Sequence, residues 1–221
     1  MNSRFKGQTQ VLTAVLLGGM LIAGVSAAYL WGIPKIKKSQ NVNNAEKSLS
    51  DIKEVSRAID SVATGSGSRT VPIDLGDGSL DIDTEKDMIT YKTLTRGLFV
   101  ARDWAPLNEN DMQGVNSSTG LPSDGYGIRG EDKPVLVIGL SSGSTGGESD
   151  LVTTTYRMVM RDIFDTGSSR TYHIDLVQNG NLDASGDSHT IHLKSAGEET
   201  DIGKGVEGGI LNRRKVMIRV S

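Results

Sequence analysis

The sequence predicts an α+β fold in which a long N-terminal hydrophobic helix precedes an all-β, sandwich-like head. Three patterns predict this layout: residues 8–33 carry no charge, residues 41–63 repeat apolar side chains every three or four positions, and apolar and polar residues alternate from Arg69 onward. The chain has 27 glycines and only 5% aromatic residues, which favours a turn-rich β body over a second helical one. We therefore expect four segments: a leader over 1–7, a hydrophobic helix over 8–34, an amphipathic helix over 35–63 and a β-rich head over 64–221.

The uncharged run over residues 8–33 is long enough for a membrane-spanning helix, because about 20 residues at ~1.5 Å rise cross a hydrocarbon core of ~30 Å. Tyr29 and Trp31 stand where an interfacial aromatic belt would lie. Gly32 and Pro34 are expected to weaken or kink the helix at its end. The basic residues that precede Glu46, the first acidic residue, flank this run on both sides: Arg4, Lys6, Lys35, Lys37 and Lys38.

The leader Arg4-Phe5-Lys6-Gly7-Gln8 places basic residues, a glycine and a glutamine directly before the hydrophobic helix. This arrangement resembles the class III signal peptide of archaeal type IV pilins and archaellins. The resemblance implies that a prepilin peptidase cuts between Gly7 and Gln8 and leaves the helix on the mature protein. Bacterial type IV pilins carry a glutamate shortly after the cut, whereas the matching position here is Leu12. Archaeal members of the family commonly lack this glutamate. A plain signal anchor that is not cut remains the alternative.

Small residues recur at four-residue spacing along the hydrophobic run, and such rows allow apolar helices to approach closely. They are Ala14, Gly18, Gly19, Ala23, Gly24, Ala27 and Ala28. On the pilin-like interpretation, the hydrophobic helix over 8–34 is the stem of each subunit, and these small residues pack the stems of neighbouring subunits into a central bundle. The alternative is that glycine and alanine are merely frequent in membrane helices.

The amphipathic segment forms one apolar stripe, made by Leu49, Ile52, Val55, Ile59 and Val62. We expect this stripe to pack across the head, with an intermolecular coiled coil as the alternative. Thr64–Ser68 (TGSGS) is expected to end the helix and link it to the head.

In the head, Asp77-Gly78 predicts a hairpin between strands over 71–75 and 79–83. Further strands are expected around Ile89–Thr93, Pro134–Leu140, Val152–Met160, Tyr172–Leu176, Ile191–Leu193 and Val216–Val220, the last tying the C-terminus into a sheet. Asp103–Asp132 and Ser141–Asp150 are rich in Gly, Pro, Ser and Asn, and they are expected to be loops.

Few residues suggest chemistry. Asn116-Ser117-Ser118 is an N-glycosylation sequon. Residues 179–187 space oxygen side chains as a Ca²⁺ loop does but lack its sixth-position glycine and final glutamate, which favours an ordinary turn. The three histidines, His173, His189 and His192, match no metal or triad spacing and are interpreted as ordinary sheet residues. The sequence thus predicts no enzyme activity and no cofactor. From Glu46 onward the chain has 19 basic and 27 acidic residues, and this acidic character argues against a nucleic-acid partner.

The resemblance implies a structural subunit of an extracellular filament. The precursor would sit in the cell membrane, be processed by prepilin peptidase, and then assemble as a homo-oligomer through its N-terminal helix, helped by the assembly ATPase and platform protein of the family. Two alternatives remain open: a minor pilin or pseudopilin, and a signal-anchored extracellular binding module that does not polymerise. The second predicts an uncut N-terminus.

Overall fold

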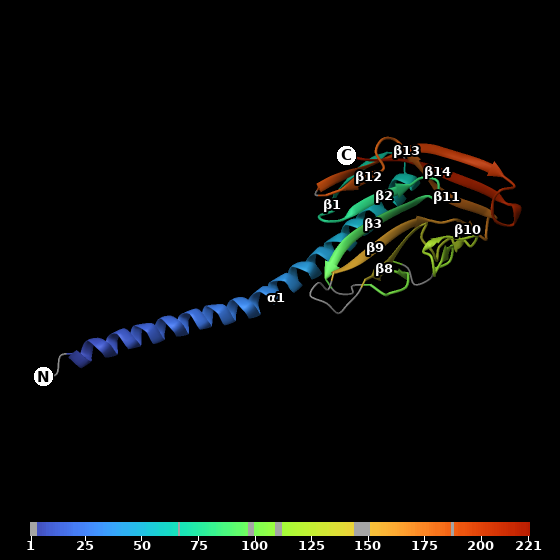
Figure 1. Cartoon of the computed structure of the whole chain (residues 1–221). Coiled ribbons are helices and arrows are strands. Elements are labelled where there is room, and N and C mark those ends of the chain that lie inside the picture. Colours follow the sequence, from blue (N-terminus) through green and yellow to red (C-terminus); the bar gives the residue numbers. More distant parts are fainter. Residues whose placement is uncertain (1–3, 66, 97–99, 109–111, 144–150, 187) are drawn as a thin grey trace. The chain divides into compact units, whose positions relative to one another are not determined.

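A computed structural model describes residues 4–65, 67–96, 100–108, 112–143, 151–186 and 188–221. The chain divides into two compact units, Met1–Asn43 and Asn44–Ser221. The first unit is helical, and the second combines a helical segment with a mostly-β body (Figure 1). The α+β layout expected from the sequence is therefore present.

Helix α1 is continuous from Arg4 to Thr64, so the two helices expected over 8–34 and 35–63 are one. Pro34 lies inside it, and the expected end near Gly32–Pro34 is not an end of the helix. A proline inside a helix removes one backbone hydrogen bond and crowds the carbonyl four residues before it, yet the helix continues through Pro34 here. The helix does end where the sequence predicted, with the Gly65 N–H donating to the Ser61 carbonyl at 3.0 Å.

Fourteen strands and one 3₁₀ turn follow α1 in the described residues. Their bounds are β1 Ser68–Asp74, β2 Ser79–Asp83, β3 Met88–Arg96, β4 Ala105–Pro106, β5 Val115–Asn116, β6 Leu121–Pro122, β7 Gly127–Ile128, β8 Val135–Ser142, β9 Leu151–Met160, β10 Ile163–Asp165, β11 Arg170–Gln178, β12 Asp183–Ser185, β13 Ser188–Ile202, η1 Val206–Gly208 and β14 Ile210–Val220.

The strands form two six-stranded sheets and a two-stranded ribbon. Sheet I has the order β1-β13-β14-β11-β10-β7, sheet II the order β12-β2-β3-β9-β8-β4, and β5 pairs with β6. Figure 1 shows β2, β3, β9 and β8 side by side in sheet II. In sheet I, β11 pairs with β14 in parallel, while β13 and β14 form a long antiparallel pair. The last residue is held there, because Ser221 and Thr190 exchange two backbone hydrogen bonds.

The apolar stripe of the amphipathic segment is buried against both sheets. Ile52, Val55, Ile59 and Val62 are at most 3% exposed, and Leu49 packs beside them. They share one hydrophobic cluster with side chains of sheet I, such as Ile191, and of sheet II, such as the residues around Tyr91. The expected packing of this segment across the head is confirmed. The stripe is covered by the chain's own sheets, so it does not serve as a coiled-coil seam.

The predicted hairpin at Asp77-Gly78 is wrong. β1 pairs with β13 in sheet I, whereas β2 pairs with β3 in sheet II, so this turn carries the chain from one sheet to the other. The turn itself exists, with the Gly78 N–H bonded to the Leu75 carbonyl at 2.7 Å. A Cβ on Gly78 would lie 2.4 Å from the Lys92 carbonyl oxygen, so glycine is required there by close approach to β3. The first hairpin is instead β2–β3, closed through residues 84–87.

The segment expected to be a loop over 103–132 contains four short strands, β4 to β7. Two arginines bind this segment: Arg157 on β9 of sheet II and Arg161 directly after β9. Arg161 Nη1 donates to the Gln113 carbonyl at 2.8 Å and its Nη2 lies 3.2 Å from Asp132 Oδ1. Arg157 donates to the Thr119 carbonyl and stacks on the Trp104 ring at 4.2 Å. The part of Ser141–Asp150 beyond Gly143 lies outside the described residues.

Candidate functional site

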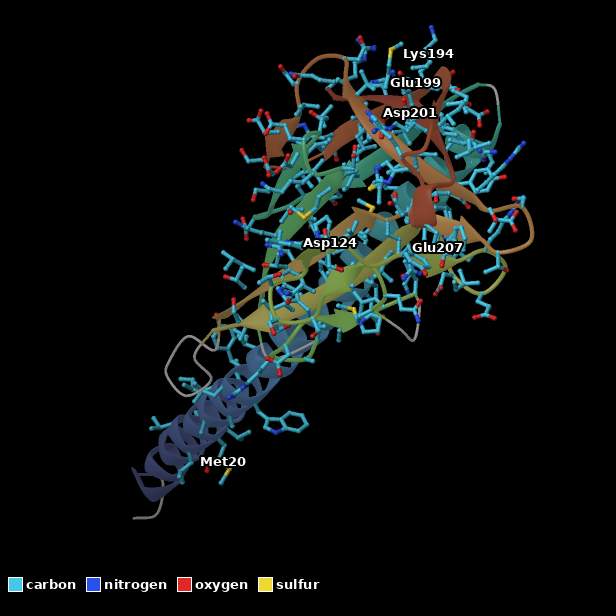
Figure 2. All side chains as sticks on the ribbon, turned by 90° about the vertical axis from the view of Figure 1, so that its right-hand side faces the viewer. Met20, Asp124, Lys194, Glu199, Asp201 and Glu207 are labelled. Atoms are coloured by element: carbon cyan, nitrogen blue, oxygen red, sulfur yellow. The ribbon has the colours of Figure 1, made fainter. Side chains whose placement is uncertain are left out.

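The most prominent functional feature of the first unit is an exposed apolar helix. Thr13–Ile33 spans 21 residues with a mean hydropathy of 1.8, and none of it is buried. Met20, labelled in Figure 2, is 73% exposed, and Ile22 and Leu30 are 70% and 74% exposed. At ~1.5 Å per residue this segment is about as long as the hydrocarbon core of a bilayer is thick. By length and composition it can be a membrane anchor or a signal sequence.

The small residues that the sequence pointed to lie on this same exposed segment. The structure places them all within α1: Ala14, Gly18, Gly19, Ala23, Gly24, Ala27 and Ala28. A Cβ added to Gly18, Gly19 or Gly24 would meet no atom within 4 Å. Glycine costs about 1 kcal/mol relative to alanine inside a helix, and no contact within the described chain accounts for that cost.

The expected cleavage positions, Gly7 and Gln8, are the fourth and fifth residues of α1. Proteases bind substrates with an extended backbone, so cutting this bond requires the first turns of the helix to unwind. Helix ends fray readily because their first N–H groups lack intrahelical partners, and a glycine there lowers helix stability further. Both residues therefore lie where the helix unwinds most readily.

Asn116, the sequon asparagine, is exposed at the end of β5. Its Oδ1 accepts hydrogen bonds from the backbone N–H groups of Ser118 at 2.9 Å and Thr119 at 3.2 Å. These bonds orient the side chain on a surface turn, where a glycan could be attached without disturbing the core.

Two of the three histidines are ordinary sheet residues, as expected. His189 Nε2 lies 3.1 Å from the Ser185 carbonyl, and His192 Nε2 lies 2.9 Å from Ser221 Oγ. In the segment over 179–187, which was expected to be an ordinary turn, residues Asp183–Ser185 form strand β12 on β2, and Asp187 lies outside the described residues.

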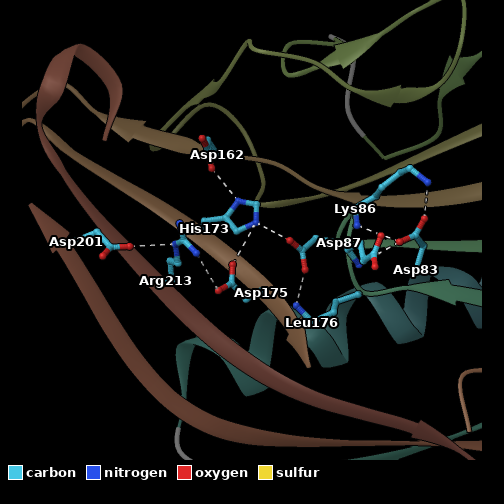
Figure 3. Close-up of polar contacts among 10 residues, drawn as sticks. Asp83, Lys86, Asp87, Asp162, His173, Asp175, Leu176, Asp201 and Arg213 are labelled. Carbon is cyan, nitrogen blue, oxygen red and sulfur yellow. Dashed lines mark hydrogen bonds and ion pairs between the residues drawn. The ribbon is translucent and has the colours of Figure 1, made fainter. Parts of the chain in front are cut away.

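His173 departs from the expectation, because three carboxylates surround it (Figure 3). Its Nδ1 lies 2.7 Å from Asp162 Oδ1, and its Nε2 lies 3.1 Å from Asp87 Oδ2 and 3.5 Å from Asp175 Oδ1. Asp87 belongs to the β2–β3 turn, Asp162 joins β9 to β10, and Asp175 shares β11 with His173. The cluster therefore joins sheet I to the turn of sheet II.

The charges of this cluster shift its protonation. Burial lowers the pKa of His173, but the hydrogen bonds and charges of Asp162 and Asp87 outweigh it and raise the pKa to about 9. Burial raises the pKa of the Asp175 carboxyl; the charge of His173 opposes that shift, and the charge of Asp87 adds to it. Asp175 also lies 3.8 Å from Arg213 Nη1, and Arg213 in turn contacts Asp201 (Figure 3).

The spacing of His173 and Asp175 in the sequence could have indicated part of this cluster. His173 and Asp175 are two residues apart on a strand, so their side chains share a face. Asp87 and Asp162 are distant in sequence from this pair, and only the tertiary fold brings them to it.

No family model, curated protein or solved structure matches the chain. The fold and the exposed segment define its class directly: an α+β protein with an apolar N-terminal helix long enough to cross a membrane and a β-rich body.

Proposed function

We propose that this chain is a structural subunit of an archaeal type IV pilus-like filament. The observation that carries the proposal is the 21-residue apolar helix over Thr13–Ile33, none of which the chain itself buries. Large apolar side chains such as Leu21 and Ile22 are 65–70% exposed there. Each gains roughly 1.5–3 kcal/mol when fully removed from water. Such a helix requires lipid or other helices around it, and a pilin uses both in succession.

The leader and the small residues favour a filament over a simple anchor. The basic residues Arg4 and Lys6 followed by Gly7–Gln8 match the class III leader, and the open space around Gly18, Gly19 and Gly24 suits close helix–helix approach. In this proposal the precursor waits in the cell membrane and prepilin peptidase removes residues 1–7. The filament ATPase and platform protein then drive the stems into a bundle, with the β bodies outside in a sandwich-like head. A minor subunit of the same filament and a non-polymerising anchored binding module are the competing functions.

The first test is the processing site. Gly7→Val is expected to leave most of the precursor uncut, because a β-branched side chain beside the scissile bond obstructs an active site that admits only a small residue. N-terminal mapping by mass spectrometry of membranes from cells with an active prepilin peptidase measures the outcome. The unaltered chain should start at Gln8.

Gly7→Ala is the matched control, because it strengthens the helix yet keeps the residue small. It should still be cut. If the unaltered chain keeps residues 1–7 while a known pilin is cut in the same cells, the filament proposal is refuted in favour of an anchored module.

We also propose that Asn116 carries a glycan on the outer surface of the filament. Ser118→Ala removes the sequon but retains the backbone N–H that Asn116 Oδ1 accepts. The intact mass of the purified protein should fall by the mass of the glycan in this variant, whereas Ser117→Ala should leave it unchanged. Equal glycan content in Ser118→Ala and the unaltered chain would contradict this assignment.

A further inference from the structure

We propose that Asp87, His173 and Asp175 form a binding site for one divalent transition-metal ion of the zinc class. The three ligand atoms would be Asp87 Oδ2, His173 Nε2 and Asp175 Oδ1. Among the described residues, these three side chains each offer one ligand atom, and the three atoms lie within 4.8 Å of one another. None of these three residues belongs to the apolar helix, so a negative result for this site would not refute the filament proposal.

The distances suit such an ion. Zinc bonds to histidine nitrogen and carboxylate oxygen are about 2.1 Å long, so neighbouring ligands of a tetrahedral site are roughly 3.4 Å apart. The two distances from His173 Nε2, 3.1 Å to Asp87 and 3.5 Å to Asp175, bracket this value. Three protein ligands leave a fourth position for water.

The orientation of His173 supports the same assignment. Its other nitrogen, Nδ1, lies 2.7 Å from Asp162 Oδ1, which fixes the ring with Nε2 turned toward Asp87 and Asp175 (Figure 3). A carboxylate behind a ligating histidine is the usual supporting arrangement at zinc sites. Asp87 is fixed as well, because its Oδ1 accepts the Leu176 N–H at 2.6 Å.

The donor set and the charges select the class of ion. An imidazole nitrogen with two carboxylates suits zinc and neighbouring first-row metals better than Ca²⁺ or Mg²⁺, which prefer oxygen alone. Asp87 and Asp175 are like charges held close together, and a dication between them would remove their repulsion. The side chains of Asp87, His173 and Asp175 are 18–19% exposed, so an ion can reach them.

Metal and proton compete for His173 Nε2, and the ion must displace the proton to bind. Either occupant would tie the β2–β3 turn of sheet II to β11 of sheet I. Asp87 takes a positive φ of 47° at this turn, a conformation that aspartate tolerates better than most residues.

The test is a titration of the full-length chain in detergent with Zn²⁺ alone, at mildly alkaline pH, after removal of bound metal with a chelator. Isothermal calorimetry should show one ion per chain in the unaltered protein. Asp175→Asn should weaken binding at least tenfold, and Asp162→Asn should weaken it roughly 10–100-fold by loosening the His173 ring. Co²⁺ should give the visible absorption bands of a four-coordinate nitrogen–oxygen site.

Two controls separate this site from adventitious binding. His192 lies on sheet I outside the cluster, so His192→Gln should bind Zn²⁺ with the affinity of the unaltered chain. His173→Gln should show no saturable Zn²⁺ binding. Circular dichroism checks that each metal-free variant is folded. If His173→Gln does not fold, Asp175→Asn is the variant that tests the site. Absence of saturable binding in the unaltered chain would overturn the proposal. Equal affinity in the unaltered chain and a folded Asp175→Asn variant would overturn it too.

Discussion

Gly18→Leu is expected to abolish filament assembly while leaving the protein inserted in the membrane. A Cβ added at this position finds no atom from other parts of the described chain within 4 Å, so the fold leaves room for a larger side chain to begin there. It also keeps the segment apolar, so insertion into lipid is preserved. The cost appears only when stems pack against each other, because the added side chain separates helix backbones that a glycine allows to approach.

The size of this effect follows from repetition along the polymer. Overpacking costs about 1–3 kcal/mol at one site, and each 1.4 kcal/mol changes an association constant tenfold. Because every subunit added to the filament meets the same obstruction, assembly should fail outright rather than slow. Electron microscopy of sheared cell-surface material, with immunoblots of the membrane fraction, measures both halves of the prediction.

Leu21→Met is the matched control on the same segment, since it conserves volume and apolarity. It should assemble normally. Normal filaments made by Gly18→Leu, with its incorporation verified, would contradict a packing role for the small residues.

Asp132→Ala is expected to destabilise the head by about 1–3 kcal/mol, because it removes the carboxylate that accepts a hydrogen bond from the buried Arg161 side chain. The Arg161 side chain is 0% exposed and that of Asp132 is 4% exposed, with 3.2 Å between Nη2 and Oδ1. Asp132 Oδ2 also accepts the Ile128 N–H at 2.7 Å, so the variant leaves that donor without its acceptor as well. Urea unfolding of the full-length chain in detergent should show a lower midpoint.

Asp124→Ala tests whether this effect is specific. Asp124 lies on the same segment but is exposed (Figure 2), and its loss should change stability by no more than about 0.5 kcal/mol. Asp132→Asn should fall between the two, because it keeps the hydrogen-bonding shape and removes the charge. Equal midpoints for Asp132→Ala and Asp124→Ala would contradict the anchoring role of this pair.

Periodic patterns in the sequence predicted much of the fold. The apolar stripe through Ile52 and Ile59 is buried, and the run over 134–140 is a buried strand of sheet II. The alternation at Val216, Ile218 and Val220 marks the core face of β14. In each case the local period decides which face is apolar, and burying that face is the main gain in free energy on folding.

Partner choice between distant strands was not predictable in this way. Asp77-Gly78 carries a strong local hairpin signal, yet β1 and β2 lie in different sheets. Val71 and Ile73 of β1 face the common core from sheet I, and Leu80 and Ile82 of β2 face it from sheet II. A turn sequence specifies a reversal of the chain, but the burial of both apolar faces decides which strands pair.

By itself, the sequence determined the apolar N-terminal helix, the buried stripe that follows it and the β character of the body, because each depends on a pattern among near neighbours. Only the tertiary structure decided that the carboxylates of Asp87 and Asp162 contact the His173 ring, and that Arg161 forms an ion pair with Asp132. Such contacts join residues that are far apart in the chain. Their energies depend on burial and distance, which no local pattern records.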